Sequence, residues 1–342
     1  MISSLKRSVA RMGIVLALLL TVPTAGGEDD DEYDCVVDAD GNGDYERIQT
    51  AIDDAKSFPR ERITIFVKDG VYDEKVSVHA WNPSVSLVGE SRDGTVLTHD
   101  DHFEKVDRGR NSTFFTYTLR TRGNDLYLRD MTVENDAGPV GQAVALHTES
   151  DRAVFENCRF LGNQDTVYAA GEGSRQYFRD CYVEGTTDFV FGSATAVFEN
   201  CRIHSKADSY VTAASTPEHV PFGFVFSDCA LTADPDVTDV YLGRPWRDHA
   251  RTAFLRCHMG AHVRPEGWHN WSRPDVEETV RYVEYDSRGP GGERADRVPW
   301  SSELTAAAAE DYAPENVLSG RDDRRPATAW YRRGLDDATD GA

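Results

Sequence analysis

One short pattern recurs along the chain, and it constrains the fold more than any other feature. Each copy has an aromatic residue, two mostly polar residues, a cysteine and then a strand-like segment. The copies are FENCRFLG (155–162), FRDCYVEG (178–185), FENCRIHS (198–205), FSDCALTA (226–233) and FLRCHMG (254–260). Their spacing is too short and irregular for repeats built from helix pairs. It predicts an all-β fold, a right-handed parallel β-helix, in which each rung buries its apolar face against the next.

The repeat also bears on the state of the cysteines. Five of the six hold the same slot on successive copies, namely Cys158, Cys181, Cys201, Cys229 and Cys257. A disulfide framework is the usual expectation for cysteines in an exported protein. Here a repeated inward-facing position favours a column of small apolar thiols, because disulfide geometry is demanding even between close neighbours. Cys35 lies outside the pattern, and the sequence predicts no role for it.

The segment before the repeats predicts a cap for the coil. Residues 38–55 run from a Gly/Asn turn into an amphipathic helix with Ile48, Ala51, Ile52 and Ala55 on one face. A short N-terminal helix there would cover strand edges at the open end. We expect the first strands within 62–72 and 85–91, a repeat core over about 62–300, and a tail over about 300–342 that packs along the outside.

The N-terminus indicates export. Lys6, Arg7 and Arg11 precede a short apolar run, and small residues follow it, as in a signal peptide over residues 1–26. The run is too short to span a membrane comfortably. Since no linker divides the remainder, residues 27–342 are expected to form a single catalytic domain of a secreted, extracellular protein that leaves the membrane after signal cleavage.

The charge balance excludes two classes of partner. The formal net charge is −22, with 59 acidic and 37 basic residues, which disfavours binding to nucleic acid or to anionic membranes. Lysine is scarce and aspartate abundant, a bias typical of a salt-adapted surface as well as of an ordinary acidic secreted protein. High salt would screen the electrostatic repulsion between such a surface and an acidic polymer.

Two aspartates share one register in the repeat. Asp165 lies seven residues after Cys158, and Asp188 lies seven residues after Cys181. They therefore occupy equivalent places on adjacent rungs, about 5 Å apart along the coil. Carboxylates so close cannot both ionise freely, so one pKa should rise and leave an ionised nucleophile beside a protonated acid. The alternative is turn capping, the commoner use of aspartate. Asp208 is also seven residues after a cysteine, Cys201, so the register alone does not distinguish catalysis from turn capping.

The neighbouring polar residues favour catalysis. Gln164 adjoins Asp165, Gln142 opens the apolar segment GQAVAL, and Arg244 lies in YLGRPW. Glutamine amides can donate to a developing oxyanion, and an arginine can hold a carboxylate ionised and oriented.

Several segments together resemble the pectin methylesterase family. They are ADGNGDYERIQTAIDDA, GPVGQAVAL, NQDTVY, GTTDFVFG, YLGRPW, GWHNW and RYVEYDSRGPGG, in order and over roughly residues 36–300. The resemblance implies a parallel β-helix that hydrolyses methyl esters of galacturonate in pectin, with no metal or other cofactor. We expect the protein to be a monomer. YVTAAS (210–215) and residues 112–118 match the family pattern loosely, which leaves subsite detail open.

The resemblance also implies roles for individual residues. Asp188 would be the nucleophile, Asp165 the general acid and then base, and Arg244 the partner that orients Asp188. Gln142 and Gln164 would stabilise the oxyanion. Trp246, Tyr168 and Phe191 would contact the sugar, although core packing is the ordinary use of each aromatic. Trp268 and Trp271 are left outside the expected site.

Two alternatives stay open at this point. A β-helix with paired carboxylates also suits a glycoside hydrolase of the polygalacturonase type, or a carbohydrate-binding β-helix without activity. A pectate lyase is disfavoured because no clustered carboxylates suggest a calcium site. The chain contains no G-x-S-x-G and no H-E-x-x-H, which disfavours a serine hydrolase and a zinc enzyme.

Overall fold

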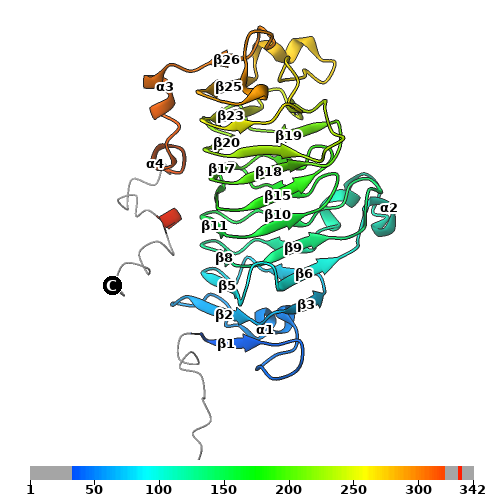
Figure 1. Cartoon of the computed structure of the whole chain (residues 1–342). Coiled ribbons are helices and arrows are strands. Elements are labelled where there is room, and N and C mark those ends of the chain that lie inside the picture. Colours follow the sequence, from blue (N-terminus) through cyan, green and yellow to red (C-terminus); the bar gives the residue numbers. More distant parts are fainter. Residues whose placement is uncertain (1–32, 320–329, 333–342) are drawn as a thin grey trace, which may run out of the picture. The chain divides into compact units, whose positions relative to one another are not determined.

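The strands visit three parallel sheets in a fixed order. In the computed structural model, which describes residues 33–319 and 330–332, each rung from β2 to β24 places one strand in sheet A, the next in sheet B and the next in sheet C. The chain then returns to sheet A one rung further along, which produces the stack of arrows in Figure 1. Neighbouring rungs pair in parallel. The predicted right-handed parallel β-helix is confirmed.

The three sheets differ in length. Sheet A contains β1 (Cys35–Val37), β2 (Ile63–Val67), β5 (Val85–Gly89), β8 (Tyr127–Arg129), β11 (Ala153–Glu156), β14 (Arg175–Arg179), β17 (Thr195–Glu199), β20 (Phe224–Ser227), β23 (Arg251–Leu255), β25 (Arg281–Tyr285) and β26 (Ser302–Glu303). Sheet B contains β3 (Gly70–Asp73), β6 (Thr95–His99), β9 (Thr132–Asn135), β12 (Arg159–Leu161), β15 (Tyr182–Gly185), β18 (Arg202–Ser205), β21 (Ala230–Ala233) and β24 (His258–Met259). Sheet C contains β4 (Val76–Val78), β7 (Leu119–Thr121), β10 (Leu146–Thr148), β13 (Val167–Ala169), β16 (Val190–Gly192), β19 (Tyr210–Ala214) and β22 (Tyr241–Pro245).

Helices lie outside the coil or at its end. The α-helices are α1 (Ile48–Asp54), α2 (Phe103–Val106), α3 (Ala306–Glu310) and α4 (Pro314–Val317). The 3-10 helices are η1 (Gly109–Phe115), η2 (Pro274–Glu278), η3 (Pro290–Gly292) and η4 (Trp330–Arg332). Within the described residues, none of the helices has the length and apolar content needed to cross a membrane. The expected signal peptide, residues 1–26, lies outside the described residues.

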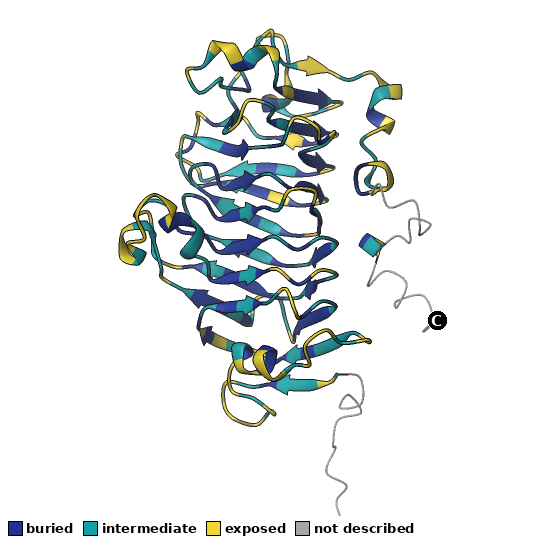
Figure 2. Ribbon diagram, turned by 180° about the vertical axis from the view of Figure 1, so that it is seen from behind, coloured by how far each residue is buried: buried dark blue, intermediate teal, exposed yellow. Residues whose placement is uncertain are grey.

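The aromatic residue of each repeat builds a continuous stack inside the coil. Neighbouring rings lie 4.4–4.6 Å apart, centroid to centroid, through Phe155, Phe178, Phe198, Phe226 and Phe254. All five side chains are fully buried. Figure 2 shows that buried residues lie along the sheets and that exposed residues lie mainly in the peripheral turns. The repeat thus pairs identical rings in register, which stabilises the stack rung by rung.

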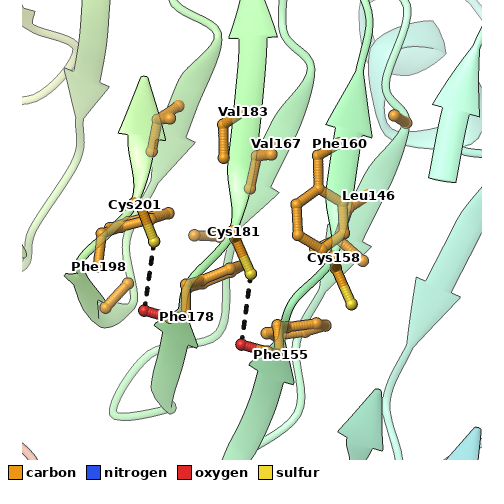
Figure 3. Close-up of a cluster of buried hydrophobic side chains, with 14 of the residues drawn as sticks. Leu146, Phe155, Cys158, Phe160, Val167, Phe178, Cys181, Val183, Phe198 and Cys201 are labelled. Atoms are coloured by element: carbon orange, nitrogen blue, oxygen red, sulfur yellow. Dashed lines mark hydrogen bonds between the residues drawn. The ribbon is translucent and has the colours of Figure 1, made fainter. Parts of the chain in front are cut away.

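The five repeat cysteines line the interior beside this stack. Each is buried and free, and Cys35 is free as well. In Figure 3 the thiols of Cys181 and Cys201 donate to the backbone carbonyls of Phe155 and Phe178 on the preceding rung, at 3.4 and 3.5 Å. The prediction of a thiol column in place of disulfides is confirmed.

The N-terminal cap starts one strand earlier than predicted. The sequence placed the first strands within 62–72 and 85–91, but β1 precedes them and pairs with β2 through Cys35 and Ile65. Cys35 therefore belongs to the first strand of sheet A. The predicted helix is present as α1, with Ile48, Ala51 and Ile52 buried. It ends at Asp54, so Ala55 is a half-buried C-cap residue and not part of the apolar face.

The end of α1 is capped from another rung. No side chain of its own N-cap residue, Arg47, satisfies the first amides. Glu74, which is buried, accepts hydrogen bonds from the backbone N–H groups of Ile48 and Gln49, at 2.8 and 3.2 Å. A carboxylate at a helix N-terminus also complements the helix dipole.

The described part of the tail packs along the outer face of sheet A. Ala309, Val317 and Tyr331 form one apolar cluster with outward side chains of sheet A such as Val154 and Val197. Figure 1 shows α3 and α4 running beside this sheet. The predicted outside packing is confirmed for this part, and residues 320–329 and 333–342 lie outside the described residues. The described part of the tail therefore covers the outer face of sheet A and not that of sheet C.

Candidate active site

Two buried aspartates occupy the same turn on adjacent rungs. Asp165 lies between β12 and β13, and Asp188 lies between β15 and β16. Because Val167 pairs with Val190, the two aspartates are equivalent positions, as the cysteine spacing predicted. Both have left-handed φ, 69° and 50°. Aspartate tolerates this region better than most residues, so both turns bring a carboxyl group to the start of a sheet C strand.

Local packing fixes the Asp188 turn. Phe189 points into the core and is fully buried, while Phe191 lies on the outer face of sheet C. A side chain at Gly185 would place its Cβ 2.2 Å from the Cβ of Phe189. Only glycine leaves room for Phe189 directly beneath the turn. The apolar run after Asp188 is therefore the wall that holds the carboxylate in place.

Arg244 binds Asp188 with two hydrogen bonds. Its Nε and one terminal nitrogen donate to the two carboxylate oxygens at 2.9 and 2.6 Å, and both side chains are largely buried. The guanidinium also lies between two rings, 4.0 Å from the centroid of Tyr210 and 3.6 Å from that of Trp271. A bidentate, stacked arginine is held rigidly and orients the carboxylate.

The two carboxyl groups have different electrostatic environments. Burial raises the pKa of Asp165 well above its usual value, and the neighbouring Asp188 carboxylate raises it further, while Arg244 acts in the opposite direction. Burial also raises the pKa of Asp188, but the hydrogen bonds and charge of Arg244 oppose that rise. Since Arg244 contacts Asp188 directly, this arrangement favours the proton on Asp165 and the negative charge on Asp188.

The two glutamines come together next to this pair. Gln142 and Gln164 form an isolated bridge between adjacent rungs, and the N–H of Ala143 donates to the carbonyl of Gln164 at 3.1 Å. Both side chains are half-buried. Neither side-chain amide has a hydrogen-bond partner within residues 33–319 and 330–332. Two unpaired amides beside the carboxyl pair are available as hydrogen-bond donors to a bound group.

The three predicted aromatics form one cluster on the outer face of sheet C. Tyr168 stacks on Phe191 with ring centroids 4.6 Å apart, and Trp246 lies 5.8 Å from Phe191. Phe114, from η1, closes the cluster at 5.1 Å from Tyr168. Tyr168 and Trp246 stay half-exposed, whereas Phe191 is 4% exposed. The cluster presents apolar ring surface next to the carboxyl pair, as a sugar-binding face requires.

The structure separates Asp208 from the pair. Although Asp208 is seven residues after Cys201, Asp188 donates its backbone N–H to the carbonyl of Tyr210, which holds the equivalent slot on the next rung. Asp208 is exposed and accepts the backbone N–H groups of Thr238 and Asp239. These bonds hold its pKa below the usual value. Asp208 thus has the turn-capping role that was the alternative for all three aspartates.

Sequence reasoning missed two contributors to the site. Trp271 was left out, yet it stacks on Arg244; its segment GWHNW was the available signal. Tyr210 was missed because the segment after Cys201 is two residues longer than the equivalent segments after Cys158 and Cys181. The position equivalent to Asp188 is therefore residue 210 and not residue 208. Trp268 was rightly left out, since it is 1% exposed and stacks on Tyr282 in the core.

One group of side chains in the described part of the chain has the spacing of a metal site. It consists of His99, Asp100 and Asp101. Lys105 contacts both carboxylates, and the Lys75 ammonium lies 2.6 Å from Asp101. Ammonium groups therefore already neutralise these carboxylates.

Fold and site together define the class. The chain is a parallel β-helix that carries two buried carboxyl groups, one of them bound by an arginine, at the start of adjacent strands of one sheet and beside an aromatic surface. The pectinesterase family pattern matches residues 34–321. Among curated relatives, pectinesterase 31 of Arabidopsis thaliana is 36% identical over 296 residues, covering 84% of this chain and 93% of the relative. The chain belongs to the pectinesterase family.

Solved structures give the same result. The pectin methylesterase from carrot superimposes with a TM-score of 0.79 at 31% identity, covering 84% of this chain and 93% of that one. A pectin methylesterase variant in complex with a hexasaccharide has a TM-score of 0.73 at 27% identity, covering 86% of this chain and 99% of that one. The chain spans only 52% of another Arabidopsis relative, a probable pectinesterase/pectinesterase inhibitor that is 39% identical over 299 residues.

Proposed function

We propose that this chain hydrolyses the methyl esters of galacturonate in pectin and releases methanol. Membership of the pectinesterase family supports the reaction class. The observation that carries the residue assignment is the bidentate contact of Arg244 with Asp188, next to a buried Asp165 without such a contact. One carboxyl group is thereby prepared as an anion and the other as an acid.

In the first half-reaction Asp188 attacks the ester carbonyl carbon. Negative charge develops on the carbonyl oxygen, and the amides of Gln142 and Gln164 donate to it. Asp165 gives its proton to the departing methoxy oxygen, so methanol leaves as a neutral molecule. The product is an acyl-enzyme, an anhydride between Asp188 and the galacturonate carboxyl group.

In the second half-reaction Asp165 acts as a base. Having lost its proton, it accepts one from a water molecule, which attacks the acyl carbon. The same two amides stabilise the second oxyanion. Asp188 leaves as a carboxylate and is again bound by Arg244, and Asp165 is again protonated. No proton has to enter from elsewhere in the cycle.

The surroundings of the pair suit a polysaccharide. Tyr168, Phe191 and Trp246 supply ring surface for sugar faces. We place the reaction outside the cell, by a secreted monomer, on the strength of the expected signal peptide and of the cell-wall polymer that the family acts on. With a net charge of −22, association with an acidic polymer should become easier as salt screens their repulsion.

The test is methanol release from highly methylated pectin by matched variants. Asp188→Asn should abolish release because it removes the nucleophile. Asp208→Asn is the control, since Asp208 also follows a cysteine by seven residues but caps a loop. Loss of activity in both variants, or in neither, would contradict the assignment of Asp188.

The same assay separates the alternatives. Methanol without new reducing ends supports an esterase, and new reducing ends without methanol would identify a glycoside hydrolase. Binding of pectin with neither product would identify a non-catalytic carbohydrate-binding protein.

A further inference from the structure

The turn formed by residues 269–273 has an unusual backbone. Trp271 and Ser272 follow each other with left-handed φ angles of 56° and 57°. A bulky residue such as tryptophan rarely adopts this conformation, because its Cβ crowds the neighbouring carbonyl oxygen. Strained backbone of this kind persists only where other contacts hold it, and it is concentrated at functional sites. The side chain that this turn positions is Trp271, whose ring centroid lies 3.6 Å from the guanidinium carbon of Arg244.

The turn is tied to β22 on both sides of Arg244. The backbone N–H of His269 donates to the carbonyl of Gly243 at 3.1 Å. At the other end, the guanidinium of Arg273 donates to the carbonyl of Pro245 at 2.6 Å. Because both ends are fixed next to Arg244, a change inside the turn alters how the tryptophan ring covers the guanidinium.

Two side chains of the turn accept the amides of its strained residues. The Nδ1 atom of His269 accepts the backbone N–H of Trp271 at 3.1 Å. The Oδ1 atom of Asn270 accepts that of Ser272 at 2.9 Å. An amide oxygen accepts a hydrogen bond at every pH, but an imidazole nitrogen accepts one only while it carries no proton. The bond that holds Trp271 therefore depends on the charge of a histidine.

The surroundings of His269 keep its imidazole neutral. Burial lowers its pKa below the usual value, and the positive charges of Arg244 and Arg264 lower it further. The rings of Tyr210 and Tyr241 lie 5.6 and 5.3 Å from the imidazole, centroid to centroid. Within the described residues, the carboxylates of this region contact the two arginines and not the imidazole; they are Asp188, Asp239 and Glu266. The neutral imidazole, with its proton on Nε2, is therefore the form present near neutral pH.

We propose that His269 is a positioning residue of the active site: its neutral imidazole holds Trp271 against Arg244, and protonation of the imidazole releases this contact. The inference rests on the proposed function and adds to it a group that controls activity in acid. An imidazolium carries N–H on both nitrogens, so Nδ1 then faces the amide of Trp271 as a second donor. The amide loses its acceptor, and the left-handed turn loses a bond that stabilises it. Arg244 keeps only Tyr210 of its two stacked rings and holds Asp188 less rigidly.

The first test observes the histidine and the tryptophan directly by NMR from about pH 4 to 8. The imidazole resonances of His269 should titrate with a pKa below the usual value of about 6.5. The indole resonance of Trp271 should move with the same midpoint, and this movement should disappear in His269→Asn. The two signals are assigned from their absence in His269→Asn and in Trp271→Phe. A Trp271 signal that stays constant while His269 titrates would overturn the proposal.

The second test measures the pH profile of methanol release. His269→Asn replaces Nδ1 with an oxygen at the same point of the side chain, and this oxygen accepts at every pH. This variant should retain most of the wild-type kcat/KM at neutral pH and lose less of it in acid. His269→Leu removes the acceptor, so its kcat/KM at neutral pH should be roughly tenfold lower, as expected for a less well oriented Asp188. An acid limb of His269→Asn that matches the wild-type limb would overturn the proposal.

The matched control is His262→Asn. His262 is also a buried histidine, its pKa is lowered by burial and by His204, and its Nε2 atom binds no group of the described residues. The profile of this variant should equal that of the wild type, and an equal change in both asparagine variants would contradict a specific role of His269. Since His269→Asn keeps the bond, it tests the pH effect even if His269→Leu does not fold. If the wild-type chain released no methanol, the proposed function would fail, and the NMR titration would still decide whether His269 holds Trp271.

Discussion

The inner and outer columns of the coil obey the same register but differ in what they repeat. Inside, phenylalanine stacks on phenylalanine over five rungs of sheet A, with a free cysteine beside each. Outside, sheet C changes residue at every rung, from Arg244 through Phe191 and Tyr168 to Arg120. Repetition inside gives each rung the same packing as its neighbour. Variation on the outside places a different functional group on each successive rung of sheet C.

The largest expected effect is a loss of stability when a ring is removed from the inner phenylalanine column. Phe198→Ala leaves a cavity between Phe178 and Phe226 in the middle of the stack and should lower the free energy of unfolding by about 3–5 kcal/mol. Chemical denaturation measures this. Methanol release per folded molecule should stay near the wild-type value, because Phe198 does not contact the site. The counterpart on the outer column, Tyr168→Ala, should raise KM and cost less stability, because the Tyr168 ring is half-exposed.

The next effect concerns the arginine at one end of the outer column. Arg244→Gln removes the two hydrogen bonds that orient Asp188, and kcat/KM should fall roughly 10²-fold. Because Arg244 opposes the rise in the pKa of Asp188, the acid limb of the pH profile should also move to higher pH. Arg244→Lys keeps the positive charge without the bidentate geometry, so its kcat/KM should lie between the values of the wild type and of Arg244→Gln. An unchanged acid limb in Arg244→Gln would show that Arg244 does not control the ionisation of Asp188.

A third, smaller effect compares two aspartates by stability. The pKa of Asp165 is raised in the folded state by burial and by Asp188. Above pH of about 4 the unfolded carboxyl group loses its proton while the folded one keeps it, so wild-type stability falls as pH rises toward the folded pKa. Asp165→Asn lacks this loss. Its advantage over the wild type in free energy of unfolding should grow by about 1.4 kcal/mol per pH unit in that window.

Asp208 should behave with the opposite sign. Hydrogen bonds from Thr238 and Asp239 lower its pKa in the folded state, so its contribution is present above the unfolded pKa and disappears as pH falls. Asp208→Asn should therefore lower stability at neutral pH and have less effect in acid. Denaturation of both variants from about pH 2 to 8 measures the contrast, and equal behaviour of the two would refute the assignment of their environments.

The smallest expected effect is none at all. Reduction of a structural disulfide costs about 2–5 kcal/mol, but the six cysteines are free. Excess reducing agent should leave the Tm unchanged. A lower Tm under reducing conditions would show that thiols of the inner column pair in solution.

The sequence could predict the columns but not their contacts. Period and identity of the FxxC copies determine the coil, the thiol column and the equivalence of Asp165 and Asp188, because identical residues stack in register. Tyr210 escaped prediction because an inserted pair of residues before it is absorbed in a turn. Trp271 lies on Arg244 only through the three-dimensional path of a loop that no repeat describes. The trans-capping of α1 by Glu74 likewise joins two rungs by a contact that local helix signals do not contain.

The spacing of the site along the chain has a consequence for how it is made. During synthesis both carboxylates leave the ribosome before Arg244, which follows Asp188 by 56 residues. A rung can stack as soon as its neighbour exists. For that interval the pair is assembled without its counter-ion, and both acids are stable in a buried turn only when protonated. The arrival of Arg244 in β22, and of Trp271 in the loop after β24, then stabilises the ionised form of Asp188, so the charge of the pair depends on segments that are made after both aspartates.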